Sequence, residues 1–136
     1  MLHEKTNKRA VAGRVGEDIA GEHLEGLGYK ILDRNIRQKF GEIDILARDK
    51  KNILCFVEVK TILTSFSKFS GLEPEDNLTA SKLRKMKKMA EWYANSHEKE
   101  VGKGGYRIDL VCVKLEGAGD PDFLKNTEIK LYTNLI

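Results

Sequence analysis

The sequence predicts an α/β fold in which a mixed central β-sheet is flanked by helices, in the order α-β-β-β-α-β-β. Two stretches, about 7–27 and 79–97, repeat apolar residues at steps of three and four, which is the period of an amphipathic helix. Five shorter apolar stretches, bounded by glycine and polar turns, are typical of strands. Helices and strands in this order are expected to pack as layers around one core.

Length and composition indicate one domain, residues 1–136, with enough apolar residues for a core. Hydrophobic residues make up 40% of the chain and charged residues 33%, so a disordered chain is excluded. The charged N-terminal stretch lacks an apolar signal segment, and no apolar run reaches the roughly 20 residues of a membrane span. We therefore expect a cytoplasmic protein, with Cys55 and Cys112 as buried thiols.

The first predicted helix carries small residues on one side. Gly13, Gly16 and Ala20 lie close together on its surface, which would allow a neighbouring backbone to approach. At about 100° per residue, Glu17 falls at the edge of the apolar stripe. Glu17 is therefore expected to be accessible at the border of the core.

The predicted strands cover residues 29–37, 41–48, 53–60, 106–115 and 127–133. Between the third strand and the second helix, residues 61–77 read as a long polar loop with two aromatic residues, Phe66 and Phe69, of a kind that is often functional. The second helix follows, with Thr79 as its expected N-cap.

Two carboxylates and one ammonium group interrupt the apolar residues of the second and third strands. Asp44 lies between Ile43 and Ile45, while Glu58 and Lys60 alternate with valines. Side chains alternate between the faces of a strand, and a short turn makes these strands antiparallel neighbours. If Ile43 and Ile45 pair with the valines on either side of Glu58, then Asp44, Glu58 and Lys60 meet on one face.

Such a group of charges can bind a metal ion. Two carboxylates a few ångströms apart repel, and one must take a proton unless a cation lies between them. Mg²⁺ prefers one or two carboxylates and several waters, and those waters can attack a phosphodiester. The alternative is an ion pair of Lys60 with Glu58, with Asp44 on a hydrated face, and spacing alone leaves both open.

Basic residues are clustered in the second predicted helix and between the first two strands. The helix carries Lys82, Arg84, Lys85, Lys87 and Lys88, and the strand region carries Arg34, Arg37 and Lys39. Clusters of this kind favour nucleic acid as the partner. The alternative is a solvated helix face.

Two further residues are expected to have structural roles. Trp92 is predicted to pack at the edge of the second helix. Asp109 is predicted to pair with a base of another strand rather than with Arg107, because residues two apart on a strand are distant.

Four segments in this order, GRVGEDIA, GYKILDRNIR, GEIDILAR and FVEVKT, resemble the YraN-like family of predicted endonucleases. The similarity covers about residues 12–113. That family is distantly similar to archaeal Holliday junction resolvases and to the restriction-endonuclease-like fold. The resemblance therefore implies this fold and a nuclease of the PD-(D/E)xK type.

The resemblance also implies site residues. The metal-binding aspartate falls on Asp44, the E-x-K pair on Glu58 and Lys60, and a further metal ligand on the Val59 carbonyl. The helix-borne acid of resolvase-like members falls on Glu17, and a lysine of the following helix falls on Lys82. The chain departs from similar proteins at two places. Those proteins often continue VEVK with T-R, whereas Thr61 is followed here by Ile62. Some related nucleases carry a glutamine in the second helix at the position of Met89.

The leading hypothesis is an Mg²⁺- or Mn²⁺-dependent endonuclease that acts on DNA. By analogy with the resolvases, the hypothesis includes branched DNA as the substrate and a homodimer as the active form. Backbone phosphates would be contacted by Lys82, Arg84, Lys85, Arg37 and Lys39. The alternatives are a non-catalytic nucleic-acid-binding module and a protein-interaction domain that uses residues 61–77. The joint presence of Asp44, Glu58 and Lys60 favours the enzyme.

Overall fold

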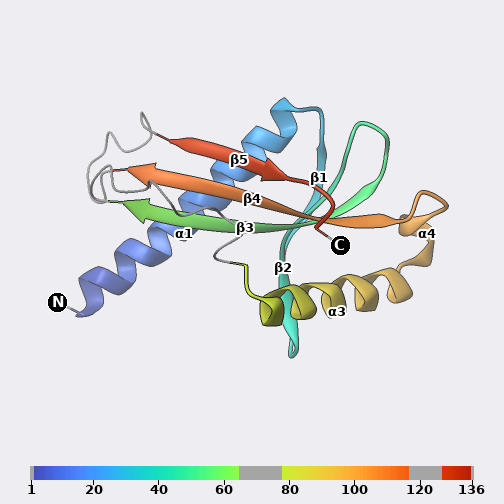
Figure 1. Cartoon of the computed structure of the whole chain (residues 1–136), viewed down its shortest axis with the longest axis horizontal. Helices are drawn as coiled ribbons and strands as arrows, with labels where there is room; N and C mark the ends of the chain where they lie inside the picture. Colours follow the sequence, from blue (N-terminus) through green and yellow to red (C-terminus); the bar gives the residue numbers. More distant parts are fainter. Residues whose placement is uncertain (1, 65–77, 117–126, 136) are drawn as a thin grey trace.

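The computed structural model describes residues 2–64, 78–116 and 127–135, and the side chains of residues 10–62, 78–115 and 127–135. Figure 1 shows a central sheet with helices on either side. The strands are β1 (Lys30–Gln38), β2 (Gly41–Arg48), β3 (Leu54–Thr64), β4 (Tyr106–Glu116) and β5 (Glu128–Tyr132). The helices are α1 (Leu2–Gly26), α3 (Ala80–Ser96) and the short α4 (Glu98–Val101). The predicted α/β class and order are confirmed, with α4 as an addition.

The sheet is mixed, and its strands lie in chain order from β1 to β5. Antiparallel pairs join β1 to β2, β2 to β3 and β4 to β5. β3 and β4 are parallel, and their ladder runs from Leu54 opposite Tyr106 to Thr64 opposite Glu116. A parallel pair needs a long crossover, and α3 lies within it.

The third strand is longer than predicted. Residues 61–64 belong to β3 rather than to the predicted loop 61–77, because β4 continues to pair with them. The rest of that loop, with Phe66 and Phe69, lies outside the described residues.

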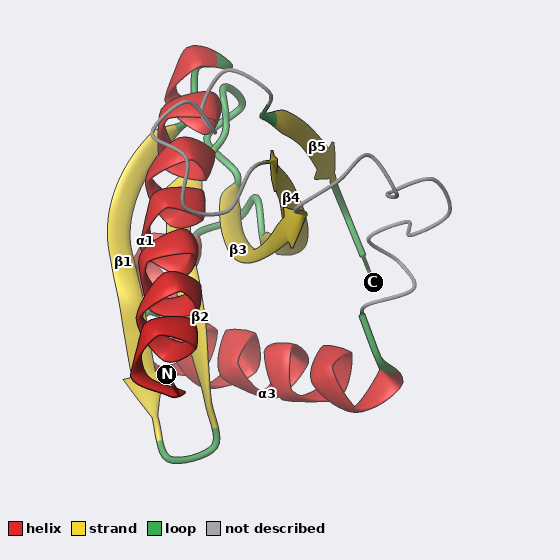
Figure 2. Ribbon diagram, turned by 90° about the vertical axis from the view of Figure 1, so that its left-hand side faces the viewer, coloured by secondary structure: helices red, strands yellow, loops and turns green. Residues whose placement is uncertain are grey.

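The two helices cover opposite faces of the sheet (Figure 2). On the α1 side, Ala20 and Leu24 pack against Ile45, Val57 and Val111. On the α3 side, the core comprises Ile43, Leu46, Leu54, Phe56, Met86, Met89, Ala90, Tyr93 and Ile108. The sheet is thus buried on both sides over its central strands.

β2 leaves β3 before the end of the hairpin. Their ladder runs from Arg48 opposite Leu54 only as far as Ile45 opposite Val57, whereas β1 stays paired with β2 down to Gly41. The hairpin of β1 and β2 extends beside α3 (Figure 1). Ile43 consequently packs on the α3 side, and the expectation that it shares a face with Ile45 was wrong.

One helix glycine brings α1 close to the sheet. A Cβ on Gly16 would collide with the side chain of Thr61 in β3, and Ala20 is fully buried on the same helix. A Cβ on Gly13 would meet nothing within 4 Å. The prediction of close approach is therefore confirmed for Gly16 and wrong for Gly13.

A polar network crosses the interior at the other end of β3 and β4. Asp109 is fully buried and accepts hydrogen bonds from Arg107 Nε at 3.0 Å and from the Asn134 N–H at 2.9 Å. The Arg107 guanidinium also donates to Asp49 Oδ2 at 2.6 Å and to the Tyr29 hydroxyl at 2.7 Å. The expectation against an Arg107–Asp109 pair was wrong, because the long arginine side chain folds back along its strand.

Two predictions from composition can be compared with the structure. Cys55 and Cys112 are buried thiols, as predicted. None of the helices in the described ranges has the length and apolar content that crossing a membrane requires.

Candidate functional site

Asp44 and Glu58 lie where β2 separates from β3. Each is only 6% exposed, and their carboxyl groups are within hydrogen-bonding reach of each other. Since the β2–β3 ladder has ended at Ile45, the N–H of Val59 is not used by β2 and donates to Asp44 Oδ2 at 2.8 Å. The separation of the strands thus creates the space in which the two acids meet.

The two acids perturb each other. Burial and the neighbouring charge of Asp44 raise the pKa of Glu58 to about 7. Burial also raises the pKa of Asp44, against the effect of the hydrogen bond from Val59. Removal of the last proton from this pair is therefore unfavourable unless a cation compensates the second negative charge.

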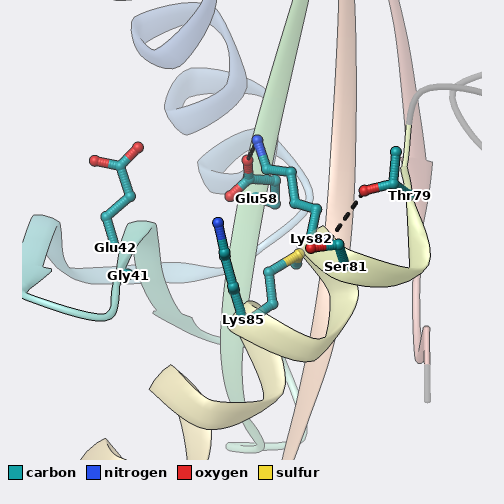
Figure 3. Close-up of a pocket in the computed structure, with 8 residues that line it drawn as sticks. Gly41, Glu42, Glu58, Thr79, Ser81, Lys82 and Lys85 are labelled. Atoms are coloured by element: carbon teal, nitrogen blue, oxygen red, sulfur yellow. Dashed lines mark hydrogen bonds and ion pairs between the residues drawn. The ribbon is translucent and has the colours of Figure 1, made fainter.

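Lys82 supplies a positive charge from the first turn of α3. Its Nζ lies 2.6 Å from Glu58 Oε1 (Figure 3). The turn is held by Thr79, which is the N-cap as predicted and whose hydroxyl accepts the Lys82 N–H at 3.1 Å. Partial burial acts to lower the pKa of Lys82, but its hydrogen bond and attraction to Glu58 raise it overall. The ammonium group thus stays protonated against the acid pair.

A pocket of about 300 Å³ opens between the acids and α3. Glu58 lies on its β3 side, and Lys82 and Lys85 extend into the same region from α3 (Figure 3). The first turn of α3 contains no acidic residue, so the positive end of its dipole is uncompensated there. Lys82, Lys85 and the helix N-terminus can contact an anion such as a phosphate group, beside the carboxylates of Glu42 and Glu58 that line the same pocket.

Glu17 approaches from the other helix. Its side chain is half-buried on α1, 3.7 Å from Arg34, which also pairs with Asp18 at 2.9 Å. Burial and the charge of Asp44 raise the pKa of Glu17. Glu17 is therefore electrostatically coupled to the acid pair, as expected for an acid at the border of the core.

Lys60 does not neutralise Glu58. It is half-buried on β3 and forms no hydrogen bond or ion pair with any other described residue. The alternative of a Lys60–Glu58 ion pair was wrong, because α3 packs over this face and places Lys82 on the carboxylate. Lys60 remains available for another partner.

The predicted phosphate contacts are distributed over two elements. Lys85 lines the pocket, whereas Arg84 is exposed on α3 away from it. Arg37 pairs with Glu42 at 3.5 Å near the end of the β1–β2 hairpin, and Lys39 lies in its two-residue turn. These two elements border the pocket.

Sequence reasoning missed the aromatic residue in that turn. Phe40 is 42% exposed and meets Trp92 of α3 edge-to-face at 6.1 Å between ring centroids. The predicted packing of Trp92 at the helix edge is confirmed, since it is half-buried there. The sequence did contain an indication of this exposed aromatic residue, because hairpin turns of two residues favour asparagine and glycine over large apolar residues such as Phe40.

The donor set limits which metal ion could bind. Within residues 2–64, 78–116 and 127–135, no three His, Cys, Asp or Glu side chains form a group that could hold a metal ion. Two adjacent carboxylates are present, and they suit a hard cation that keeps most of its waters, such as Mg²⁺ or Mn²⁺. A tetrahedral zinc site is not available from these residues.

Comparison with known sequences places the chain in a protein family. Residues 16–113 match the model of the uncharacterised protein family UPF0102. The chain belongs to this family. The UPF0102 protein of Syntrophotalea carbinolica is 41% identical over 112 residues, which cover 82% of this chain and 85% of that protein.

Two further UPF0102 proteins show a similar extent of match. One from Mycobacterium sp. (strain KMS) is 34% identical, with 89% of this chain and 86% of that protein covered. Another, from Campylobacter jejuni (strain 81-176), is 39% identical, with 79% and 87% covered. The match to the UPF0102 model includes Glu17, Asp44, Glu58, Lys60 and Lys82.

Proposed function

We propose that this chain is a metal-dependent endonuclease that hydrolyses phosphodiester bonds of DNA. The observation that carries the proposal is the buried pair of Asp44 and Glu58 on separating strands, beside a pocket lined by two lysines. Buried acids with raised pKa values beside a pocket are candidates for a functional site. Lys82 and Lys85 could contact a phosphate group there, although Glu42 and Glu58 line the same pocket.

Asp44 and Glu58 would hold the metal ion. The N–H of Val59 points to Asp44, and since the N–H and C=O of a residue point to the same side of a strand, the Val59 carbonyl faces the same gap. It would complete a ligand set of three protein oxygens with waters. When bound, Mg²⁺ or Mn²⁺ would polarise a phosphoryl oxygen and lower the pKa of a water.

The other residues of the site would bind and orient the substrate. Lys82 and Lys85 would contact the phosphate that enters the pocket. Lys60, without a partner in the described residues, would orient the attacking water or stabilise developing negative charge. Glu17 would assist from α1.

The choice of DNA follows from the resemblance of the GEID and VEVK segments to the YraN-like and resolvase-like nucleases. The mixed sheet with helices on both faces is compatible with the restriction-endonuclease-like fold. The same resemblance favours branched DNA as substrate and a homodimer as the active form. Fold likeness alone does not fix a substrate, so several DNA structures belong in the test.

The function is tested by incubating the protein with plasmid, single-stranded and four-way-junction DNA. We expect at least one of these to be cleaved with Mg²⁺ or Mn²⁺ and to remain intact with EDTA. If all three stay intact with either metal while binding is salt-sensitive, the endonuclease proposal fails. The protein is then a nucleic-acid-binding module.

That module is the second candidate, and one observation favours it. The ammonium group of Lys82 lies 2.6 Å from Glu58 and compensates part of the charge of the acid pair without a metal ion. If Asp44 and Glu58 do bind a metal ion, the ammonium group of Lys82 competes with it for the same carboxylate. Lys82 would then leave Glu58 when the metal ion arrives.

Replacing Lys82 with methionine is expected to tighten Mn²⁺ binding by roughly tenfold, because the competing charge is removed while most of the apolar stem is kept. Titration of free Mn²⁺ by electron paramagnetic resonance measures the dissociation constant directly. Lys87→Met, an exposed substitution on the same helix, is the matched control and should leave it unchanged. Equal or weaker Mn²⁺ binding by K82M would show that Lys82 does not occupy the metal position.

A further inference from the structure

Phe40 is exposed at a place where turn formation does not require it. It lies with Lys39 in the two-residue turn between β1 and β2. Type I′ turns need positive φ at both central positions, and neither residue is among those with positive φ in the described chain. A large aromatic side chain therefore has another reason to stand at the end of this hairpin.

The position of Phe40 is set by close packing beneath it. A Cβ on Gly41 would lie 2.7 Å from Met89 Cγ, so only glycine allows the hairpin to rest on α3 at this distance. This contact brings Phe40 to Trp92, and the two rings meet edge-to-face. The aromatic pair is thus fixed to the helix rather than held on a free loop.

Lysines connect this aromatic pair to the pocket. Lys85, Lys88 and Trp92 are spaced at three and four residues and share one edge of α3. That edge faces the hairpin, because Gly41 packs beside Lys85 and Phe40 beside Trp92. Glu91 lies about 100° around the helix from Trp92 but follows Lys88 by three residues, so it borders this edge, and Glu42 is paired with Arg37. We call Phe40, Lys85, Lys88 and Trp92 the basic–aromatic edge.

We propose that the basic–aromatic edge binds one unpaired strand of nucleic acid, with a base stacked on Phe40 and phosphates on Lys88 and Lys85. Aromatic side chains beside a positively charged groove are the features by which proteins hold single strands without reading their sequence. A base inside a duplex is already stacked on its neighbours and cannot offer its face to Phe40.

The geometry also places the unpaired base relative to the acid pair. Lys82 and Trp92 are ten residues apart on α3, a distance of about 15 Å along the helix axis. A strand bound at both ends would therefore have an unpaired base within a few nucleotides of the phosphate in the pocket. This inference rests on the proposed action on nucleic acid and names the substrate class, a strand with unpaired bases beside the scissile bond.

The test is binding in EDTA, so that its result does not depend on cleavage. The probes are a fluorescein-labelled thymidine oligonucleotide and a blunt duplex of the same length. We expect Phe40→Leu, which keeps the apolar side chain and removes the aromatic face, to weaken binding of the single strand about tenfold and of the duplex less than twofold. Phe40→Tyr should bind the single strand like the unchanged protein.

Two controls separate stacking from other effects. Leu32→Ala removes another exposed apolar side chain from β1 and should change neither affinity. Trp92 is the only tryptophan of the chain, so its fluorescence should be quenched by the single strand and not by the duplex. Equal losses of both affinities in F40L, or no loss, would overturn the inference.

Two further outcomes separate strand binding from a contact between two copies of the chain, and strand binding from DNA cleavage. If the unchanged protein sediments as a dimer and F40L as a monomer, with unchanged affinity for the single strand, Phe40 belongs to a contact between two copies, and the inference fails. If the single strand binds as expected but no DNA is cleaved with Mn²⁺, the inference holds while the endonuclease proposal fails.

Discussion

Asp44→Asn is expected to abolish metal-dependent cleavage, with a loss of at least about 100-fold. Asparagine has nearly the same shape and can still accept the hydrogen bond from the Val59 N–H through its oxygen. It removes one of the two carboxylates proposed to hold the metal ion, and loss of even an outer-shell partner commonly costs 10- to 100-fold. Initial rates on the best cleaved DNA measure the effect.

The same substitution should raise the stability of the metal-free protein. Asp44 is buried against Glu58 and raises its pKa, so the pair is a source of repulsion in the folded state. We expect a higher melting temperature for D44N in EDTA, and a smaller increase on adding Mn²⁺ than the unchanged protein shows. Glu91→Gln, an exposed change on α3, is the matched control. Undiminished cleavage by D44N would disprove the site assignment.

Asp109→Ala is expected to lower the free energy of unfolding by about 3–5 kcal/mol, the usual loss when one partner of a buried ion pair is removed. Asp109 is fully buried and accepts hydrogen bonds from both Arg107 and the Asn134 N–H. The substitution would leave the guanidinium with an unpaired Nε and the amide without an acceptor. Urea unfolding at neutral pH, followed by circular dichroism, measures the change.

A double-mutant cycle tests whether the pair itself is responsible. Arg107→Met and Asp109→Ala together should cost clearly less than the sum of the two single changes, because neither residue then leaves the other unpaired, although Asp49 loses Arg107 in both R107M and the double variant. Additive losses would mean that the two residues act independently. A D109A variant within 1 kcal/mol of the unchanged protein would show that the network is dispensable.

The meeting of Asp44 and Glu58 could be predicted because it depends on local rules. A short turn makes the two strands antiparallel. Because side chains alternate between the two faces of each strand, the register of the pair decides which residues lie together on one face. Thr79 as an N-cap was predictable for the same reason, since the capping hydrogen bond spans only three residues. Features that depend on a few neighbouring residues can be predicted from a single sequence.

The features that were missed depend on how distant elements pack. The resemblance implied Lys82 as a site residue but not its contact with Glu58, which arises because α3 docks over β3. Ile43 changes side because β2 bends away from β3 toward α3. Arg107 is shared among Asp49, Asp109 and Tyr29, which come from three regions of the chain. Periodicity within one element contains no information on these contacts.

The long parallel ladder of β3 and β4 has a consequence for the order of folding. The two acids sit on adjoining strands and can approach each other as soon as the local hairpin forms. β4 pairs with β3 between residues 52 positions apart in the chain, such as Leu54 and Tyr106, and such non-local pairing is slow because a large loop must close first. We therefore expect the carboxylates to be brought together early, while the lysine that neutralises them arrives with the crossover helix, among the last events of folding.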